Sequence, residues 1–194
     1  MFALRFASLF LAASTALVSA VPTPIPTPAE LEKRASIAKI TGVLNTLEGS
    51  VSGILPQIDS LVASGTAVTA GALSPLIFEL STALNTATTA LALLSIGLRD
   101  LPDSPERRQT AQDVADLAAG LVTDIADTLG PVEALGVAGL AGLLGTVDTA
   151  LNGVLVGLNG LLAGVLTLVA GLVGPVAGIL GSLGLGAVLG SLGL

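Results

Sequence analysis

The C-terminal segment of this chain, residues 149–194, restricts the possible folds most, because it carries no charged side chain. Leucine, valine, alanine and glycine make up most of it. Bulky aliphatic residues recur at alternating steps of four and three, from Leu140 to Leu183. This spacing returns side chains to one face of an α-helix. The sequence therefore predicts a heptad-like helical stripe that continues for more than forty residues.

A second stripe, mostly of glycine, lies two positions further along with the same spacing. Its glycines are Gly153, Gly157, Gly160, Gly164, Gly171, Gly174, Gly178 and Gly181. Glycine inside a helix costs up to about 1 kcal/mol relative to alanine. We therefore expect close helix packing at these positions, as in contacts between small residues spaced four apart, or an apolar environment that compensates.

Three interpretations of this segment remain open. In the one we favour, its aliphatic stripe contacts an apolar surface or another copy of the chain. The stripe consists of Leu151, Leu155, Leu158, Leu162, Val165, Val169, Leu172, Val176, Ile179 and Leu183. In the second, the segment is a buried hairpin at the centre of a helical bundle. In the third it is membrane-inserted or lipid-anchored, since residues 160–180 have the length and apolarity of a spanning helix, although Pro175 interrupts them.

Residues 35–148 carry all remaining charges of the expected mature chain and predict ordinary amphipathic helices. One apolar stripe covers residues 37–61, where we expect Pro56 to kink or split the helix. Ser74-Pro75 predicts the start of a second helix. A third covers residues 114–129 and is expected to stop at Gly130-Pro131. The fold class is therefore all-α, a bundle of amphipathic helices with a long apolar C-terminal helical region.

The N-terminus has the pattern of a secreted precursor. Residues 1–20 place a basic residue before an apolar run and end in small residues, which predicts a signal peptide cleaved between Ala20 and Val21. Residues 21–34 are proline-rich and expected to be extended. They end in Lys33-Arg34, a pair typical of propeptide cleavage by a kexin-type secretory protease of fungi.

Residues 100–110 carry two prolines and several charges, and they predict an exposed linker. Arg107-Arg108 within it is a second candidate processing site. The expected organisation is a signal peptide (1–20), a propeptide (21–34), an amphipathic helical module (35–148) and an uncharged Gly/Leu-rich segment (149–194).

Missing residue types exclude most chemistry. The chain has no Cys, His, Trp or Tyr, which excludes disulfide scaffolds, Cys/His zinc sites and nucleophiles activated by histidine. A net charge of −7 argues against nucleic acid, as does the scarcity of aromatic stacking residues, since three of the four phenylalanines lie in the first ten residues. Asp113, Asp116, Asp124 and Asp127 share one helix face, which we interpret as a solvated acidic face rather than a calcium site. We expect no enzyme activity and no cofactor.

The chain resembles the fungal hydrophobic surface-binding protein A family, especially basidiomycete members among secreted hyphal wall and matrix proteins. The resemblance is carried by residues 33–58, 73–77, 113–117 and 121–125, and by the Gly/Leu tail. It implies an all-helical secreted protein that adsorbs to hydrophobic surfaces or wall polymers, aids attachment and recruits secreted hydrolases. Self-association is a further expectation. The alternative is a membrane-inserted or lipid-anchored cell-surface protein.

Overall fold

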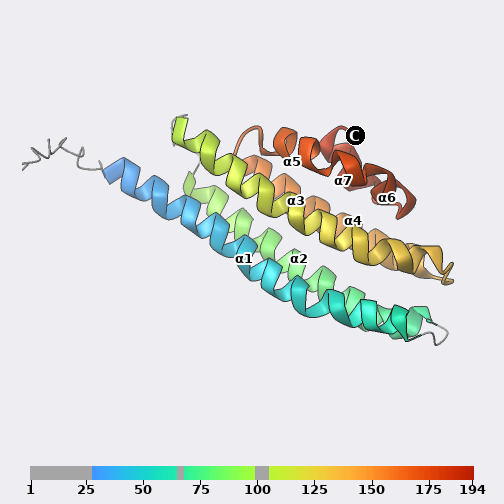
Figure 1. The fold of residues 1–194 in the computed structure, drawn as a ribbon. Helices are drawn as coiled ribbons and strands as arrows, with labels where there is room; N and C mark the ends of the chain where they lie inside the picture. The colour runs from blue at the N-terminus through green and yellow to red at the C-terminus, as the bar shows by residue number, and fades with distance from the viewer. Residues whose placement is uncertain (1–27, 65–67, 99–104) are drawn as a thin grey trace, which may run out of the picture.

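The computed structural model describes residues 28–64, 68–98 and 105–194, and within these ranges every regular element is a helix (Figure 1). The predicted all-α class is confirmed. The predicted signal cleavage between Ala20 and Val21 lies outside the described residues. The helices are α1 (Pro28–Ala63), α2 (Ala70–Leu98), α3 (Pro105–Ala134), α4 (Leu140–Leu161), α5 (Val165–Val173), a 3₁₀ turn (Gly174–Val176), α6 (Ala177–Ser182) and α7 (Gly186–Leu192).

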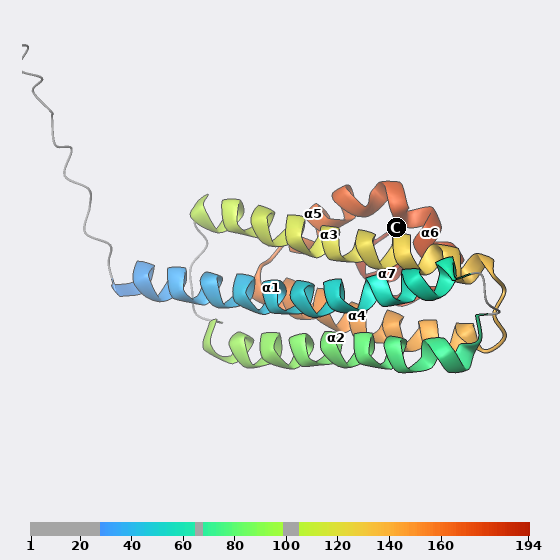
Figure 2. The same cartoon turned by 60° about the horizontal axis from the view of Figure 1, so that its bottom comes forward.

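The four long helices form a bundle that the short C-terminal helices complete. α1 packs against both α2 and α3, and α2 packs against α4. α3 and α4 make few direct contacts with each other. Instead, α5 packs mainly on α3 while α7 packs on α4, so the C-terminal helices fill the space between these two (Figures 1 and 2). The C-terminal part of the chain is therefore an integral part of the bundle.

A single apolar core runs through the bundle, and the periodic stripes supply it. On α1 the stripe from Ile40 to Ile58 is buried, and on α2 so is the stripe from Leu73 to Leu91. α3 contributes positions such as Ile125 and Leu129, which are fully buried. Because side chains three and four residues apart share one face, each helix buries one side and leaves the other to solvent.

The helix boundaries predicted at three prolines are wrong: Pro56 does not split a helix, Pro75 does not start one and Pro131 does not end one. α1 is continuous through Pro56, α2 begins five residues before Pro75, and α3 continues past Pro131 to Ala134. All three prolines are exposed, and buried residues on both sides of each hold the helix in place despite the lost hydrogen bond. The start of α2 is capped by Thr69, whose Oγ1 accepts the backbone N–H of Ala72 at 3.3 Å.

The predicted single stripe of more than forty helical residues is broken into several helices. α4 ends at Leu161, and the chain reverses through Gly164, which has a φ of +84°. A second reversal follows at Gly184, with a φ of +73°. Glycine adopts this left-handed conformation without steric cost, whereas other residues rarely do. The segment therefore folds back on α3 and α4 instead of extending away from the bundle.

The boundary between charged and uncharged sequence is not a boundary in the structure. It falls after Asp148, in the middle of α4. α4 buries residues on both sides of this point, among them Leu144 and Leu155, in the same core. Residues 149–194 thus belong to the same unit as the amphipathic helices.

Both basic pairs lie within helices, whereas the sequence analysis expected them on extended or linker chain. Lys33-Arg34 lies in the first part of α1 and Arg107-Arg108 in the first turn of α3. The helices begin at Pro28 and Pro105. Proline suits the first helical position, where its missing N–H would have no partner inside the helix. The linker before α3 is therefore shorter than residues 100–110.

Candidate apolar-surface site

Most of the predicted surface-contact residues lie in the core instead. Seven of the ten are buried: Leu151, Leu155, Leu158, Leu162, Val165, Val169 and Leu183. α2 covers the part of the stripe that lies on α4, and the reversal after α4 packs the part on α5 against α3. Leu172 (43% exposed) and Ile179 (36%) are on the surface, and Val176 is partly buried. The second interpretation of the segment, a buried hairpin, describes this fold better than an open apolar stripe.

Close packing at glycine occurs between α4 and α2. A Cβ added to Gly153 would lie 3.1 Å from Thr88 Oγ1, and one added to Gly157 would lie 3.3 Å from Leu91 Cβ. A Cβ at Gly181 would make only an ordinary contact, at 3.9 Å. The remaining predicted packing glycines have nothing within 4 Å of such a Cβ: Gly160, Gly164, Gly171, Gly174 and Gly178. These five glycines are exposed, and because they have no side chain they leave the helix backbone accessible at the surface.

Asp148 holds α7 against α4. Its side chain is buried, and its two carboxylate oxygens accept the backbone N–H groups of Ala187 and Val188, each at 3.0 Å. Both donors lie in the first turn of α7, where a negative charge also interacts favourably with the helix dipole. One turn further along α4, Asn152 Oδ1 accepts a hydrogen bond from the hydroxyl of Ser191. We call these two contacts the α4–α7 latch.

The exposed surface of α4–α7 carries no charged side chain. Asp148 is the sole charged side chain in residues 140–194, and it is buried with both oxygens hydrogen-bonded. The exposed positions are mainly glycine, alanine and threonine, with Val156, Leu172 and Ile179 as the larger apolar residues. α4 lies on the side of the bundle opposite α1 (Figure 2). Among the described residues, the side of the bundle that α4–α7 form therefore exposes no charged side chain; we call it the uncharged side.

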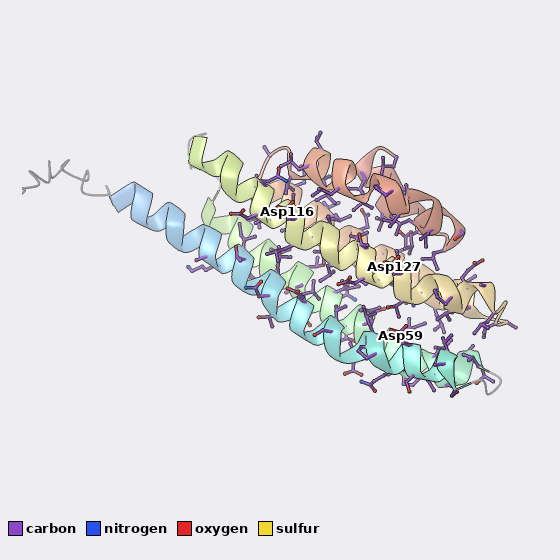
Figure 3. The ribbon with its side chains drawn as sticks, in the orientation of Figure 1. Asp59, Asp116 and Asp127 are labelled. Atoms are coloured by element: carbon purple, nitrogen blue, oxygen red, sulfur yellow. The ribbon has the colours of Figure 1, made fainter. Side chains whose placement is uncertain are left out.

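Apart from the buried Asp148, the charged residues whose exposure is described lie on the first three helices. The four aspartates of α3 that were predicted to form a solvated face are all exposed. Figure 3 shows two of them, Asp116 and Asp127, together with Asp59 on α1. Gln112 Nε2 donates a 3.0 Å hydrogen bond to Asp116 Oδ1. Within the described ranges, no three His, Cys, Asp or Glu side chains are grouped so that they could hold a metal ion.

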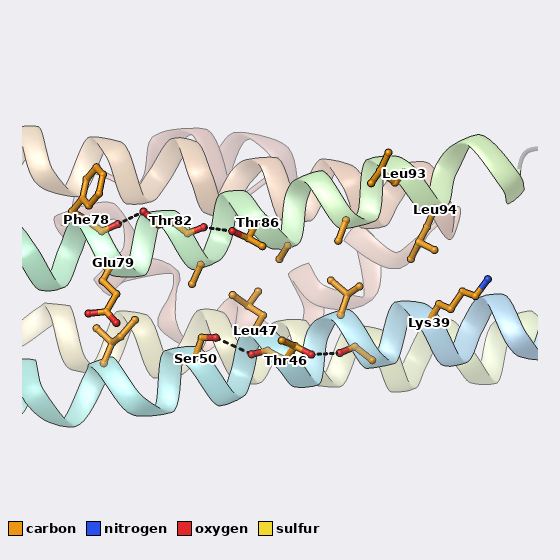
Figure 4. Close-up of a pocket in the computed structure, with 16 residues that line it drawn as sticks. Lys39, Thr46, Leu47, Ser50, Phe78, Glu79, Thr82, Thr86, Leu93 and Leu94 are labelled. Atoms are coloured by element: carbon orange, nitrogen blue, oxygen red, sulfur yellow. Dashed lines mark hydrogen bonds between the residues drawn. The ribbon is translucent and has the colours of Figure 1, made fainter.

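A groove that the sequence analysis did not identify runs between α1 and α2, with a volume of about 970 Å³ (Figure 4). Leu47, Ile54 and Ala87 form its floor, and small residues line its walls. Phe78 (73% exposed) and Leu93 (67%) lie at its two ends and are the most exposed large apolar side chains described. Both lie outside the core-facing stripe of α2, and two large apolar residues on the outward face of a helix could have predicted an exposed apolar site there.

Three stretches of helix are long and apolar enough to cross a membrane, judged by length and composition. They are Ala70–Ser95, Leu140–Leu161 and Val165–Ser182. In this fold each of the three stretches buries one apolar face in the shared core. The predicted span of residues 160–180 does not form one helix, because the chain turns between Leu161 and Val165.

Comparison with known proteins gives one informative similarity. Over 75 residues the chain is 49% identical to fruiting body differentiation protein 16 of Flammulina velutipes, a basidiomycete fungus. The match covers 39% of this chain and 57% of that protein, so it spans little more than half of the relative. No known family model matches the chain. The resemblance to the hydrophobic surface-binding protein A family stays a prediction, while the similarity to a fungal protein stands.

Proposed function

We propose that this protein is a secreted, non-enzymatic, surface-active component of the fungal cell wall or extracellular matrix that adsorbs to hydrophobic surfaces and aids attachment. The observation that carries the proposal is the exposed surface of α4–α7, which has no charged side chain. The fungal setting is supported by the similarity to a protein whose name refers to fruiting body differentiation. Wall polymers and secreted hydrolases are the partners consistent with this role.

The distribution of charged side chains determines which side of the protein contacts the surface. Placing an ionised side chain against an apolar surface removes its water, which costs several kcal/mol per ion. The uncharged side of the bundle avoids this cost, and each 100 Å² of apolar area it covers contributes about 2.5 kcal/mol. The exposed aspartates of α3 stay hydrated when the uncharged side is in contact. The molecule is thus expected to adsorb through α4–α7.

Opening of the bundle would strengthen adsorption in a second step. Core residues such as Val165 and Val169 lie on α5, which packs mainly against α3, and they are fully buried in the closed fold. If α5–α7 separate from α3 and α4, an apolar surface can replace the core as the partner of these side chains. The α4–α7 latch opposes this separation, since opening it leaves Asp148 without its two backbone donors. The buried stripe would then act in adsorption only after first contact.

Charge placed on the uncharged side tests the proposal. Val156→Lys with Leu172→Lys adds two cations to exposed positions of α4 and α5, while Asn45→Lys with Ser52→Lys adds two to an exposed face of α1. Adsorption to methyl-terminated and hydroxyl-terminated monolayers is measured with a quartz crystal microbalance. We expect the first variant to bind the methyl surface at least tenfold more weakly, and the control to bind like the unmodified protein. Equal binding by both variants contradicts the proposal.

Substitution is a cleaner test than deletion of residues 149–194. Such a truncation would cut α4 in the middle and uncover Leu144 and Val147, which are buried in the intact fold. The truncated chain would expose new apolar surface of its own. Its adsorption would therefore not report on the α4–α7 surface.

Membrane insertion is the second candidate, favoured by the three stretches that have the length and composition of spanning helices. It predicts that the protein sediments with membranes, resists alkaline carbonate and requires detergent for release. The adsorption proposal predicts recovery from culture medium and wall without detergent. An intact-mass measurement of the recovered protein further detects a lipid anchor and both processing events.

A further inference from the structure

The groove between α1 and α2 has the features of an interface. Along α2 it extends from Phe78 to Leu94, which corresponds to about 24 Å of helix. Its floor and the exposed residues at its ends are apolar. In the described part of the chain nothing covers Phe78 and Leu93, although large apolar side chains gain free energy when they leave water. This face is separate from the uncharged side formed by α4–α7.

The polar groups on the groove walls do not oppose burial. Thr46 and Ser50 donate their hydroxyl protons to carbonyl oxygens one turn back on α1, at 2.8 and 3.0 Å. Thr82 and Thr86 do the same on α2, both at 2.8 Å (Figure 4). Because these donors are already satisfied within their own helices, covering the groove leaves none of them without a partner. The walls therefore accept a second apolar surface at low cost.

The two charged residues of the groove lie at opposite ends. Lys39 on α1 lies at the end marked by Leu93 and Leu94, while Glu79 lies beside Phe78 at the other end (Figure 4). Lys39 is the single cationic residue whose side-chain exposure is described, and both it and Glu79 are exposed. An occupant that matches this pattern presents an acidic group at the first end and a basic group at the second.

We propose that the occupant is the same groove of a second copy, in an antiparallel two-fold dimer. A two-fold axis lying across the groove exchanges its ends, so Lys39 meets the end that holds Glu79 of the second copy. The same rotation brings Phe78 opposite Leu93 of the second copy, on paired α2 helices. A two-fold axis along the groove would not exchange its ends, so Lys39 would lie at the same end as Lys39 of the second copy. Like charges oppose that arrangement, and opposite charges favour the first.

The expected dimer is weak and independent of adsorption. A face about 24 Å long and about 20 Å wide buries on the order of 1,000 Å² from both copies together, the low end for a specific interface. We therefore expect dissociation in the micromolar range. α5–α7 lie on the far side of the bundle from α1 and α2 and stay free in the dimer (Figure 1).

Sedimentation velocity of the intact protein between about 1 and 100 µM tests the dimer, with circular dichroism as the check on folding. The protein is expected to pass from monomer to dimer over this range. Lys39→Glu and Glu79→Lys are each expected to weaken the dimer at least tenfold, and the double variant to restore it. Asp124→Lys, the same change of charge as Glu79→Lys placed on α3, is expected to leave it unchanged.

A folded Phe78→Lys variant is expected to stay monomeric at 100 µM. Phe78 is exposed, so its replacement should not disturb the core. The proposal is overturned if the unmodified protein is monomeric at 100 µM or if Phe78→Lys still dimerises. It is also overturned if the double variant Lys39→Glu with Glu79→Lys does not restore the dimer that each single variant weakens. A bound lipid detected by mass spectrometry in a purely monomeric sample would assign the groove to an amphiphile instead.

Discussion

The backbone N–H of Val188 donates a 3.0 Å hydrogen bond to Oδ1 of Asp148, 40 residues earlier in the chain. With the matching bond from Ala187 to Oδ2, one carboxylate satisfies two N–H groups at the start of α7. The last charged residue of the sequence thus fixes the end of the uncharged segment.

Replacement of Asp148 by alanine is expected to lower the free energy of unfolding by about 3 kcal/mol, because one buried and one part-buried backbone donor lose their acceptors. Asp148→Asn keeps one carbonyl oxygen and should lose about half as much. Chemical denaturation measures both. Asp124→Ala, at an exposed aspartate of α3, should stay within about 0.5 kcal/mol of the unmodified protein. If Asp148→Ala is as stable as this control, the contact does not hold α7.

Opening of α5–α7 on an apolar surface can be tested by locking the latch. The chain has no cysteine, so Asn152→Cys with Ser191→Cys introduces a single pair, which a short bifunctional thiol reagent can link. The linked protein is expected to adsorb to a methyl-terminated surface but to desorb readily on dilution. The unlinked pair should convert to a slowly desorbing state, since its core stripe can reach the surface. Identical desorption of both forms, followed by quartz crystal microbalance, would show that adsorption needs no opening.

Burial divides the aliphatic stripe into core and surface members. Leu158 is fully buried, so Leu158→Ala should destabilise the fold by about 3 kcal/mol through lost contacts and a cavity. Leu172 is 43% exposed, and Leu172→Ala should cost less than about 1 kcal/mol. Thermal and denaturant unfolding of the two variants measure the difference. Similar costs would mean that Leu158 is not packed in the core as the structure has it.

Local pattern explains what the sequence could predict. The helical stripes of α1, α2 and α3 depend on side chains three and four residues apart, and such spacing is visible within one helix. The acidic face of α3 was predictable for the same reason. The continuation of the helices through Pro56 and Pro131 was not predictable, because tertiary packing around an exposed proline decides whether the helix continues.

Contacts between distant residues explain what the sequence could not predict. Twelve glycines follow Thr149, and nothing local distinguishes Gly164 and Gly184, where the chain reverses, from those that stay helical. The role of Asp148 depends on α7, about forty residues later. The groove depends on the pairing of α1 with α2, which neither helix pattern predicts alone, although the positions of Phe78 and Leu93 outside the α2 stripe were visible in the sequence. Reversals, latch and groove are therefore properties of the folded chain alone.

The last prediction concerns the close approach of α4 to α2. A Cβ at Gly153 would lie 3.1 Å from Thr88 Oγ1 and 3.2 Å from its Cγ2, and the Thr88 hydroxyl is bonded to the Leu84 carbonyl oxygen. Gly153→Ala should therefore be less stable than Gly145→Ala, where a Cβ meets nothing within 4 Å. At Gly145 alanine should stabilise the helix by about 0.5–1 kcal/mol.

A double-mutant cycle identifies the cause of that difference. Thr88→Ala removes the atoms that a Cβ at Gly153 would meet, so Gly153→Ala should be better tolerated by at least about 1 kcal/mol in the Thr88→Ala background. Gly145→Ala should have the same effect in both backgrounds, because a Cβ at Gly145 would meet nothing within 4 Å. Denaturant unfolding of the unmodified protein and the five variants supplies the free energies. An interaction energy near zero would show that contact with Thr88 does not destabilise the Gly153→Ala variant.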